Sequence, residues 1–144
     1  MKIIIVGTAY PYRGGLSAFN ERLAREFVRQ GNEVEIYTFT LQYPSFLFPG
    51  KTQFSDDEAP ADLKITRRIN SVNPLNWISV GKEIKGKNPD KIIFCYWMAF
   101  MAPCFGTIAR FAKTEKTKII SLVHNMIPHE PSVLDKLFPK YFVK

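Results

Sequence analysis

Residues 2–30 restrict the fold most, because they have the patterns of a strand, a glycine-bearing loop and a helix in direct succession. The run from Lys2 to Val6 is dominated by isoleucine, which is typical of a parallel strand that helices cover on both faces. From Leu16 onward the apolar residues recur with a helical period, so this part is predicted to be an amphipathic helix. The stripe expected to face the core is Leu16, Phe19, Leu23, Phe27 and Val28.

The loop between this strand and this helix is about ten residues long and carries the pair Gly14 and Gly15. Ser17 can cap the start of the helix, and Gly31 stands where a left-handed residue commonly ends one. Such a unit brings free backbone N–H groups to the carboxyl edge of the sheet, where α/β proteins bind ligands and often anions. A plainer interpretation stays open, in which the two glycines only satisfy unusual backbone angles in a turn.

The rest of the chain alternates between strand and helix patterns, which favours an α/β fold: a Rossmann-like open parallel sheet with helices on both faces. The strand at 63–69 is expected near an edge because Arg67 and Arg68 interrupt it, and the one at 118–123 near the middle. The helix that Pro74 opens is expected to bury Leu75, Ile78 and Ile84. The remaining predicted strands are 33–40 and 91–96, and the predicted helices are 74–87, 99–113 and 131–142.

The segment 41–62 breaks this alternation, since it contains three prolines and no helical period. Its first half is aromatic and its second half is acidic. Long loops of this kind are commonly functional or disordered, and we expect the aromatic half to pack on its own domain or on a partner.

Length and charge limit the class of protein. The 144 residues fit one domain, no apolar run approaches the roughly 18 residues of a membrane span, and we expect a cytoplasmic protein. The two cysteines, Cys95 and Cys104, match no zinc or redox spacing and are predicted to be buried thiols. The net charge of +7 favours solvated helix faces or an anionic partner, such as the inner membrane surface. Nucleic acid is disfavoured, because no basic run alternates with aromatics.

Several catalytic motifs are missing from the sequence. The first loop is not a dinucleotide fingerprint, since only Gly7 follows the strand closely and the second strand ends without an acidic residue. No G-K-[ST] follows, no serine or cysteine sits in a nucleophile elbow, and no carboxylate pair suits glycoside hydrolysis.

A second candidate constellation is the stretch from His124 to Glu130, His-Asn-Met-Ile-Pro-His-Glu. Because His124 follows directly on a buried strand, its ring is expected at the same carboxyl edge as the glycine pair. There it could contact a small molecule, or it could bond loop backbone together with Asn125. A metal site with His129 and Glu130 is disfavoured, because Pro128 prevents one continuous helical face and no HExxH spacing exists.

These motifs, in this order, resemble glycosyltransferase family 4. The resemblance is carried by the glycine pair, by a helix of the form L-A-x-x-F-x-x-x-G-N-x-V (Leu23 to Val34) and by V-H-N-x-x-P-H-E (Val123 to Glu130). The loop from Tyr43 to Gln53 is also similar to a subgroup of bacterial members, whereas Asn32 departs from the histidine common in the family. The likeness spans nearly the whole chain and is to the N-terminal half of these retaining GT-B enzymes.

The resemblance implies a function and a set of site residues. The chain would be the N-terminal, acceptor-side domain (1–144) of a hexosyltransferase in polysaccharide biosynthesis, with the C-terminal donor domain absent and no activity alone. Its partners would be a nucleotide sugar and a glycan or lipid-linked acceptor, and it would need no cofactor and no metal. Gly14 and Gly15 would face the diphosphate or the acceptor, and His124 would lie near the transferred sugar. The rim would also include Tyr10, Arg13 and Asn125.

Two alternatives to an enzyme remain open. One is a non-enzymatic Rossmann-like binding module for an anionic ligand. The other is a peripheral membrane protein, for which Phe138, Tyr141 and Phe142 beside Lys140 and Lys144 would suit an anionic lipid surface. That aromatic tail could equally be an interface with an absent domain.

Overall fold

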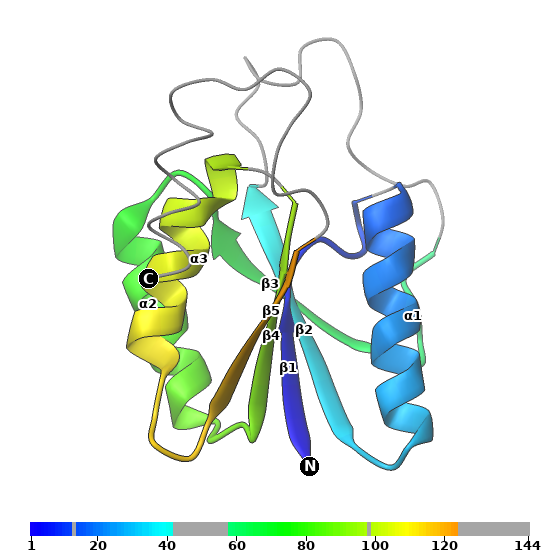
Figure 1. Ribbon diagram of the computed structural model, residues 1–144. Helices are drawn as coiled ribbons and strands as arrows, with labels where there is room; N and C mark the ends of the chain where they lie inside the picture. The colour runs from blue at the N-terminus through cyan, green and yellow to red at the C-terminus, as the bar shows by residue number, and fades with distance from the viewer. Residues whose placement is uncertain (13, 42–57, 98, 124–144) are drawn as a thin grey trace, which may run out of the picture.

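In the part of the chain that the structure describes, five strands lie side by side in one parallel sheet with the order β3-β2-β1-β4-β5 (Figure 1). The computed structural model describes residues 1–12, 14–41, 58–97 and 99–123. In chain order the elements are β1 (Lys2–Val6), α1 (Gly15–Arg29), β2 (Glu33–Leu41), β3 (Lys64–Asn70), α2 (Pro74–Gly86), β4 (Lys91–Tyr96), the short 3-10 helix η2 (Ala99–Met101), α3 (Ala102–Ala112) and β5 (Lys118–Val123). The predicted Rossmann-like α/β class is confirmed, as is the edge position of β3.

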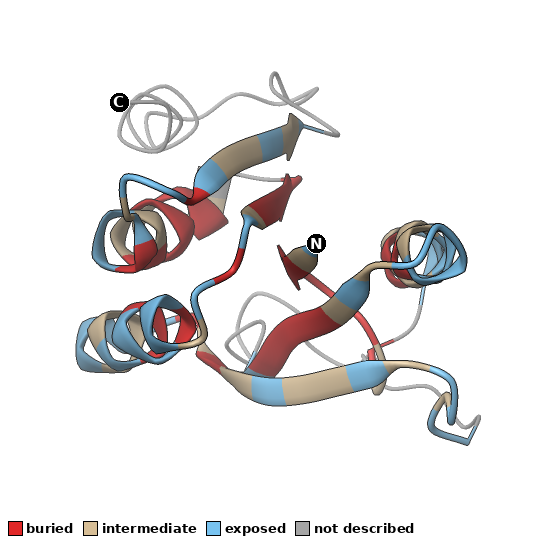
Figure 2. Cartoon of the chain, turned by 90° about the horizontal axis from the view of Figure 1, so that it is seen from below, coloured by how far each residue is buried: buried red, intermediate tan, exposed pale blue. Residues whose placement is uncertain are grey.

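The helices cover both faces of this sheet. In Figure 1, α1 lies on one face, and α2 and α3 lie together on the other. Figure 2 shows that buried residues concentrate in the strands and on the sides of the helices that face them. The apolar strands are therefore enclosed on both sides, as isoleucine-rich parallel strands require.

Two apolar clusters form the core. The cluster toward α2 and α3 is rich in aromatic rings and includes Tyr37, Phe39, Phe94, Tyr96 and Phe105. The cluster toward α1 is smaller and mainly aliphatic, with Ile3, Ile5, Ile36 and Ile93 at its centre. Successive residues of β1 alternate between the two clusters, which is the period-two pattern of a strand buried on both faces.

The end of α1 agrees with the prediction. Gly31 follows the helix with a φ of 93°, a conformation that glycine adopts readily. Its N–H donates to the carbonyl of Val28, and the N–H of Asn32 donates to that of Phe27. These two bonds form a Schellman motif, so the position of Gly31 as a C-terminal cap is confirmed.

The start and the buried face of α1 differ from the prediction. Ser17 does not cap the helix; it is buried and faces the sheet together with Asn20 and Ala24. Phe19 and Val28, expected in the core stripe, are 43% and 44% exposed. The helix is rotated relative to the expected orientation because its small and polar residues, rather than its largest apolar ones, contact the loop that precedes it. Leu16, Leu23 and Phe27 are still partly buried against the core.

One further prediction is partly confirmed, one is wrong, and two concern residues that the structure does not describe. Leu75 was expected in the core but is 78% exposed in the first turn of α2, whereas Ile84 is buried and Ile78 is half-buried. Within the described residues β5 pairs with β4 alone, at an edge of the sheet rather than near its middle. The predicted helix 131–142 and the aromatic part of the loop after β2 lie outside the described residues. No helix in the described part of the chain is long and apolar enough to cross a membrane.

Candidate functional site

The carboxyl edge of the sheet holds the start of α1. Gly14 precedes the helix with a φ of 120° and a ψ of 178°, and it is exposed together with Gly15. A Cβ added at either glycine would meet no atom of the described residues within 4 Å. The first intrahelical bond runs from the N–H of Ala18 to the carbonyl of Gly14. The preceding N–H groups of the first turn therefore have no acceptor within the helix.

The two longest described helices differ at their N-termini. In α2 the side chain of Asn73 accepts hydrogen bonds from the N–H groups of Leu75 and Asn76. In α1 the cap position is a glycine, no side chain among the described residues caps the turn, and the turn contains no acidic residue. Among the described residues, the positive end of the α1 dipole is thus not paired with an acidic group of its first turn, which is the arrangement that suits an external anionic group.

The loop that leads to this helix is tied to its surroundings by polar groups. The N–H of Tyr10 donates to Oε1 of Glu21 at 3.0 Å, and Nδ2 of Asn20 donates to the carbonyl of Thr8 at 2.8 Å. The hydroxyl groups of Thr8 and Ser17 are 3.1 Å apart and share a hydrogen bond. The loop is therefore held by the helix it precedes.

An aromatic cluster lies beneath this edge. The ring of Phe39, at the carboxyl end of β2, lies 6.3 Å from that of Tyr12, 6.0 Å from that of Trp97 and 6.2 Å from that of Phe105. The guanidinium of Arg67 lies 5.9 Å from the centre of the Tyr12 ring. Tyr12 and Trp97 are both buried, so the cluster gives the edge a rigid apolar base with a cation beside it.

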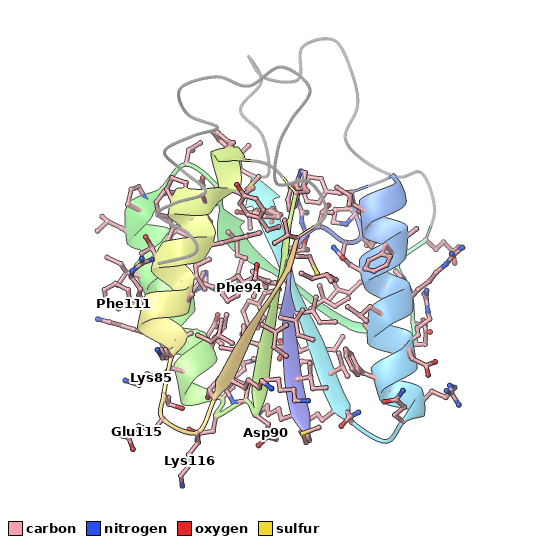
Figure 3. The ribbon with its side chains drawn as sticks, in the orientation of Figure 1. Lys85, Asp90, Phe94, Phe111, Glu115 and Lys116 are labelled. Carbon is pink, nitrogen blue, oxygen red and sulfur yellow. The ribbon has the colours of Figure 1, made fainter. Side chains whose placement is uncertain are left out.

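A cavity of about 310 Å³ opens beside this edge, between Tyr10 and the edge strand β3. It is lined by Tyr10, Ala59, Pro60, Leu63, Ile65 and Arg67. A second, larger cavity of about 530 Å³ lies at the opposite end of the sheet and is lined in part by Asp90, Glu115 and Lys116. Figure 3 shows these three residues at the amino ends of the strands, far from the start of α1. Of these two cavities, the one beside Tyr10 lies nearer to the glycine pair, because Tyr10 belongs to the loop that leads to it.

The buried cysteines are not nucleophiles. Cys95 lies directly beneath Gly7, because a Cβ added at that glycine would be 3.0 Å from the Cβ of Cys95. Burial raises the pKa of the Cys95 thiol to about 12 and raises that of Cys104 as well. Both thiols are free and remain protonated at neutral pH, so their prediction as buried thiols is confirmed.

The structure describes some of the predicted site residues but not others. Gly14 and Gly15 lie at the carboxyl edge, as expected, and Tyr10 lies half-buried in the same loop. Arg13, His124 and Asn125 lie outside the described residues. Val123, the residue before His124, pairs with Tyr96 at the carboxyl end of β4. Since β1 is the other neighbour of β4, the ends of β1 and β5 are two strand spacings apart, roughly 10 Å.

The sequence pattern did not identify the residues that hold the loop. Ser17, Asn20 and Glu21 are polar and recur at the spacing of one helix face, and such residues are ordinarily assigned to the solvent side. Their one distinguishing signal is position, because this polar face begins two residues after a glycine pair. Thr38 was missed for a similar reason, since a threonine in a strand gives no sign of the bond that its Oγ1 accepts from Ala9 N–H at 3.1 Å.

Comparison with known proteins gives a structural match. No protein-family model matches the chain, and no curated protein matches it by sequence. Among solved structures, the apo form of the lipopolysaccharide outer core galactosyltransferase WaaB is similar, with a TM-score of 0.60 and 13% sequence identity. The match covers 99% of this chain and 37% of that chain, so the chain spans little more than a third of that enzyme's length. At this identity the likeness concerns the fold.

Proposed function

We propose that the chain is the N-terminal, acceptor-side half of a retaining GT-B glycosyltransferase of family 4. In this proposal a C-terminal half binds the nucleotide-sugar donor, and the sugar passes to a glycan or lipid-linked acceptor in the cleft between the halves. No metal and no other cofactor takes part. The observation that carries the proposal is the open, glycine-capped start of α1 at the carboxyl edge of a sheet whose fold is similar, over 99% of the chain, to part of a galactosyltransferase.

The chemistry of sugar transfer explains why such an edge is useful. Negative charge develops on the departing diphosphate, and fixed N–H donors stabilise it most when they are already oriented. The first-turn N–H groups of α1, next to Gly14 and Gly15, are donors of this kind. The glycines matter because they have no side chain of their own to obstruct a ligand that approaches the backbone there.

His124 completes the proposed site. It follows β5, and the end of β5 shares the carboxyl edge with the end of β1. The ends of β1 and β5 are roughly 10 Å apart with β4 between them, so the loops that follow these two strands leave the sheet near one another. In this proposal His124 donates a hydrogen bond to the transferred sugar, and Tyr10, Arg13 and Asn125 line the rim.

The experiment compares two histidine variants in the natural protein that contains this domain. Its activity is followed as release of nucleoside diphosphate from UDP-galactose and from a panel of other nucleotide sugars, in the presence of glycan and lipid-linked acceptors. We expect His124→Ala to lower the rate of transfer about a hundredfold or more. His129→Ala removes the other histidine of these 144 residues, from the same segment, and we expect little effect.

Two outcomes would contradict the proposal. Equal transfer by His124→Ala and by the unaltered protein would remove the role of His124. Absence of transfer with every donor would overturn the enzymatic assignment, and retained binding of UDP in that case would favour a binding module. The anomeric configuration of the product, measured by NMR, separates retention from inversion.

A further inference from the structure

We infer that Ser17, Asn20 and Glu21 are positioning residues that hold the β1–α1 loop in the shape that opens the start of α1 to a ligand. The identity of that ligand rests on the proposed function. That these residues hold the loop does not depend on the proposed function, because it follows from contacts among described residues.

The three side chains lie on one face of α1 and bond consecutive parts of the loop. The amide of Asn20 and the hydroxyl of Ser17 both bond Thr8, through its carbonyl at 2.8 Å and its hydroxyl at 3.1 Å. The carboxylate of Glu21 accepts the N–H of Tyr10 at 3.0 Å. The helix thus binds back onto the residues that lead into it.

The sheet and the loop itself supply the remaining bonds. The N–H of Ala9 donates to Oγ1 of Thr38 at 3.1 Å, and the N–H of Tyr12 donates to the carbonyl of Ala9 at 2.9 Å. Together with the contacts of the helix, these bonds engage the backbone at positions 8, 9, 10 and 12, just before the glycine pair. A loop tied at this many points has little freedom to change the direction in which the first turn of α1 faces.

Burying a polar side chain lowers the stability of the fold unless its hydrogen bonds compensate. Asn20 is 1% exposed, and its Oδ1 has no hydrogen-bond partner among the described residues. Leucine has the same branching and would leave no such acceptor unpaired, although its two methyl groups take more room. Packing alone therefore favours an apolar residue here, and what asparagine adds is the bond to the carbonyl of Thr8.

A ligand at this edge needs N–H donors with a fixed orientation. N–H donors that already point toward the ligand require no rearrangement when charge develops on it. Such precision depends on side chains that support the binding groups from behind. Ser17, Asn20 and Glu21 have that place, since they bond the loop from the buried side of α1 while Gly14 and Gly15 are exposed.

The first test uses a pair of variants at Glu21 in the 144-residue chain. Glu21→Ala removes the acceptor of the Tyr10 N–H, whereas Glu21→Gln keeps an acceptor oxygen at the same place. Glu21 is half-buried, so both variants are expected to fold. Hydrogen exchange of the Tyr10 amide, followed by NMR, should accelerate roughly tenfold in Glu21→Ala and change less than about threefold in Glu21→Gln. Equal exchange in Glu21→Ala and the unaltered chain would overturn the inference.

The second test uses Asn20→Leu with Leu23→Ala as its matched control on the same helix. Asn20→Leu should accelerate exchange of the Ala9 and Tyr12 amides about tenfold, beyond any change that the larger leucine side chain causes in the urea midpoint. Leu23→Ala, which removes apolar contacts with the core, should lower the midpoint without affecting those two amides. A lowered midpoint with unchanged loop amides in Asn20→Leu would mean a purely structural role and would overturn the inference for that residue.

The third readout connects the loop to activity. In the natural protein, Glu21→Ala should lower kcat/KM for the nucleotide sugar at least tenfold, and Glu21→Gln should restore most of it. Equal loss in both variants would contradict a positioning role. If the unaltered protein transfers no sugar at all, the proposed function fails, while the exchange measurements still decide whether these residues hold the loop.

Discussion

The ammonium group of Lys87, at the C-terminal end of α2, lies 2.8 Å from Oε2 and 3.0 Å from Oε1 of Glu35, a buried carboxylate in β2. The hydroxyl of Thr66 donates to the same carboxylate at 2.6 Å, and Lys64 approaches it within 3.5 Å. Burial has the largest influence on the pKa of Glu35 and acts to raise it, yet the bonds from Lys87 and Thr66 and the two nearby cations lower it overall. The bond to Glu35 raises the pKa of Lys87.

Lys87→Met should destabilise the domain, because it leaves most of a buried negative charge without compensation. Loss of one partner of a fully buried ion pair costs about 3–5 kcal/mol. Here Lys64 remains, and the side chain of Lys87 is itself 27% exposed. We therefore expect a loss of about 2 kcal/mol in the free energy of unfolding, measured by urea denaturation.

Lys85→Met is the matched control for this variant. It removes the same charge from the last turn of the same helix, but from an exposed position. Its effect should stay within about 0.5 kcal/mol. A similar loss in both variants would show that overall charge, rather than the pair with Glu35, stabilises the fold.

The contribution of this pair should depend on pH in a defined direction. The pKa of Glu35 is lowered from 4.5 in the folded protein, so the carboxylate stabilises the fold above that value and loses this effect as the pH falls through the folded pKa. The pKa of Lys87 is raised from 10.5, so its contribution is complete below that value and is lost as the pH rises through the folded pKa. The difference in stability between the unaltered protein and Lys87→Met should be constant from about pH 6 to 8 and shrink below about pH 4. A constant difference down to pH 3 would contradict the assignment.

Two glycines of α2 should respond oppositely to alanine. A Cβ at Gly81 would lie 2.6 Å from the Cβ of Phe111 and 3.0 Å from the carbonyl oxygen of Ile108, because α2 and α3 approach closely there. Gly81→Ala should therefore destabilise the domain by about 2 kcal/mol. Gly86 has no atom within 4 Å of the added Cβ, so Gly86→Ala should raise stability by up to about 0.5 kcal/mol. Thermal unfolding followed by circular dichroism compares the two, and a harmless Gly81→Ala would mean that the helices can separate without loss.

The strands could be predicted because the residues of each strand determine its structure. The isoleucine-rich runs around Ile4, Ile92 and Ile119 have one stable arrangement in a chain of this length, as strands of a parallel sheet beneath helices. The cap at Gly31 was predictable for the same reason, since a glycine at the end of an apolar period has a specific conformational use. In each case a short segment determines its own structure.

The orientation of α1 was not predictable from its own residues. Its apolar period suggested that Phe19 faces the core, whereas the structure buries Ser17 and Asn20 instead. That choice depends on the loop before the helix, whose carbonyl and N–H groups need partners once the sheet covers them. The same contrast holds for the candidate site. The place of Gly14 and Gly15 was predictable from the sequence, whereas the side chains that support them were not.

Gly15→Ala is the sharpest test of whether a ligand contacts the start of α1. Gly15 is the first residue of the helix, and an added methyl group there meets no atom within 4 Å. The variant should therefore fold as well as the unaltered protein, with a melting temperature that is unchanged or slightly higher. Gly14→Ala is less informative, because alanine is strained at a φ of 120° and would disturb the loop itself.

The same methyl group would lie where a bound anion approaches the first-turn N–H groups of α1. Under the proposed function, sugar transfer by the natural protein should therefore fall at least tenfold in Gly15→Ala while its thermal unfolding stays the same. Gly86→Ala provides the comparison, since it adds a methyl group at another open helical position, near the opposite end of the sheet. If both variants transfer sugar at the rate of the unaltered protein, the start of α1 does not contact the reacting groups, and the glycine pair serves only the turn.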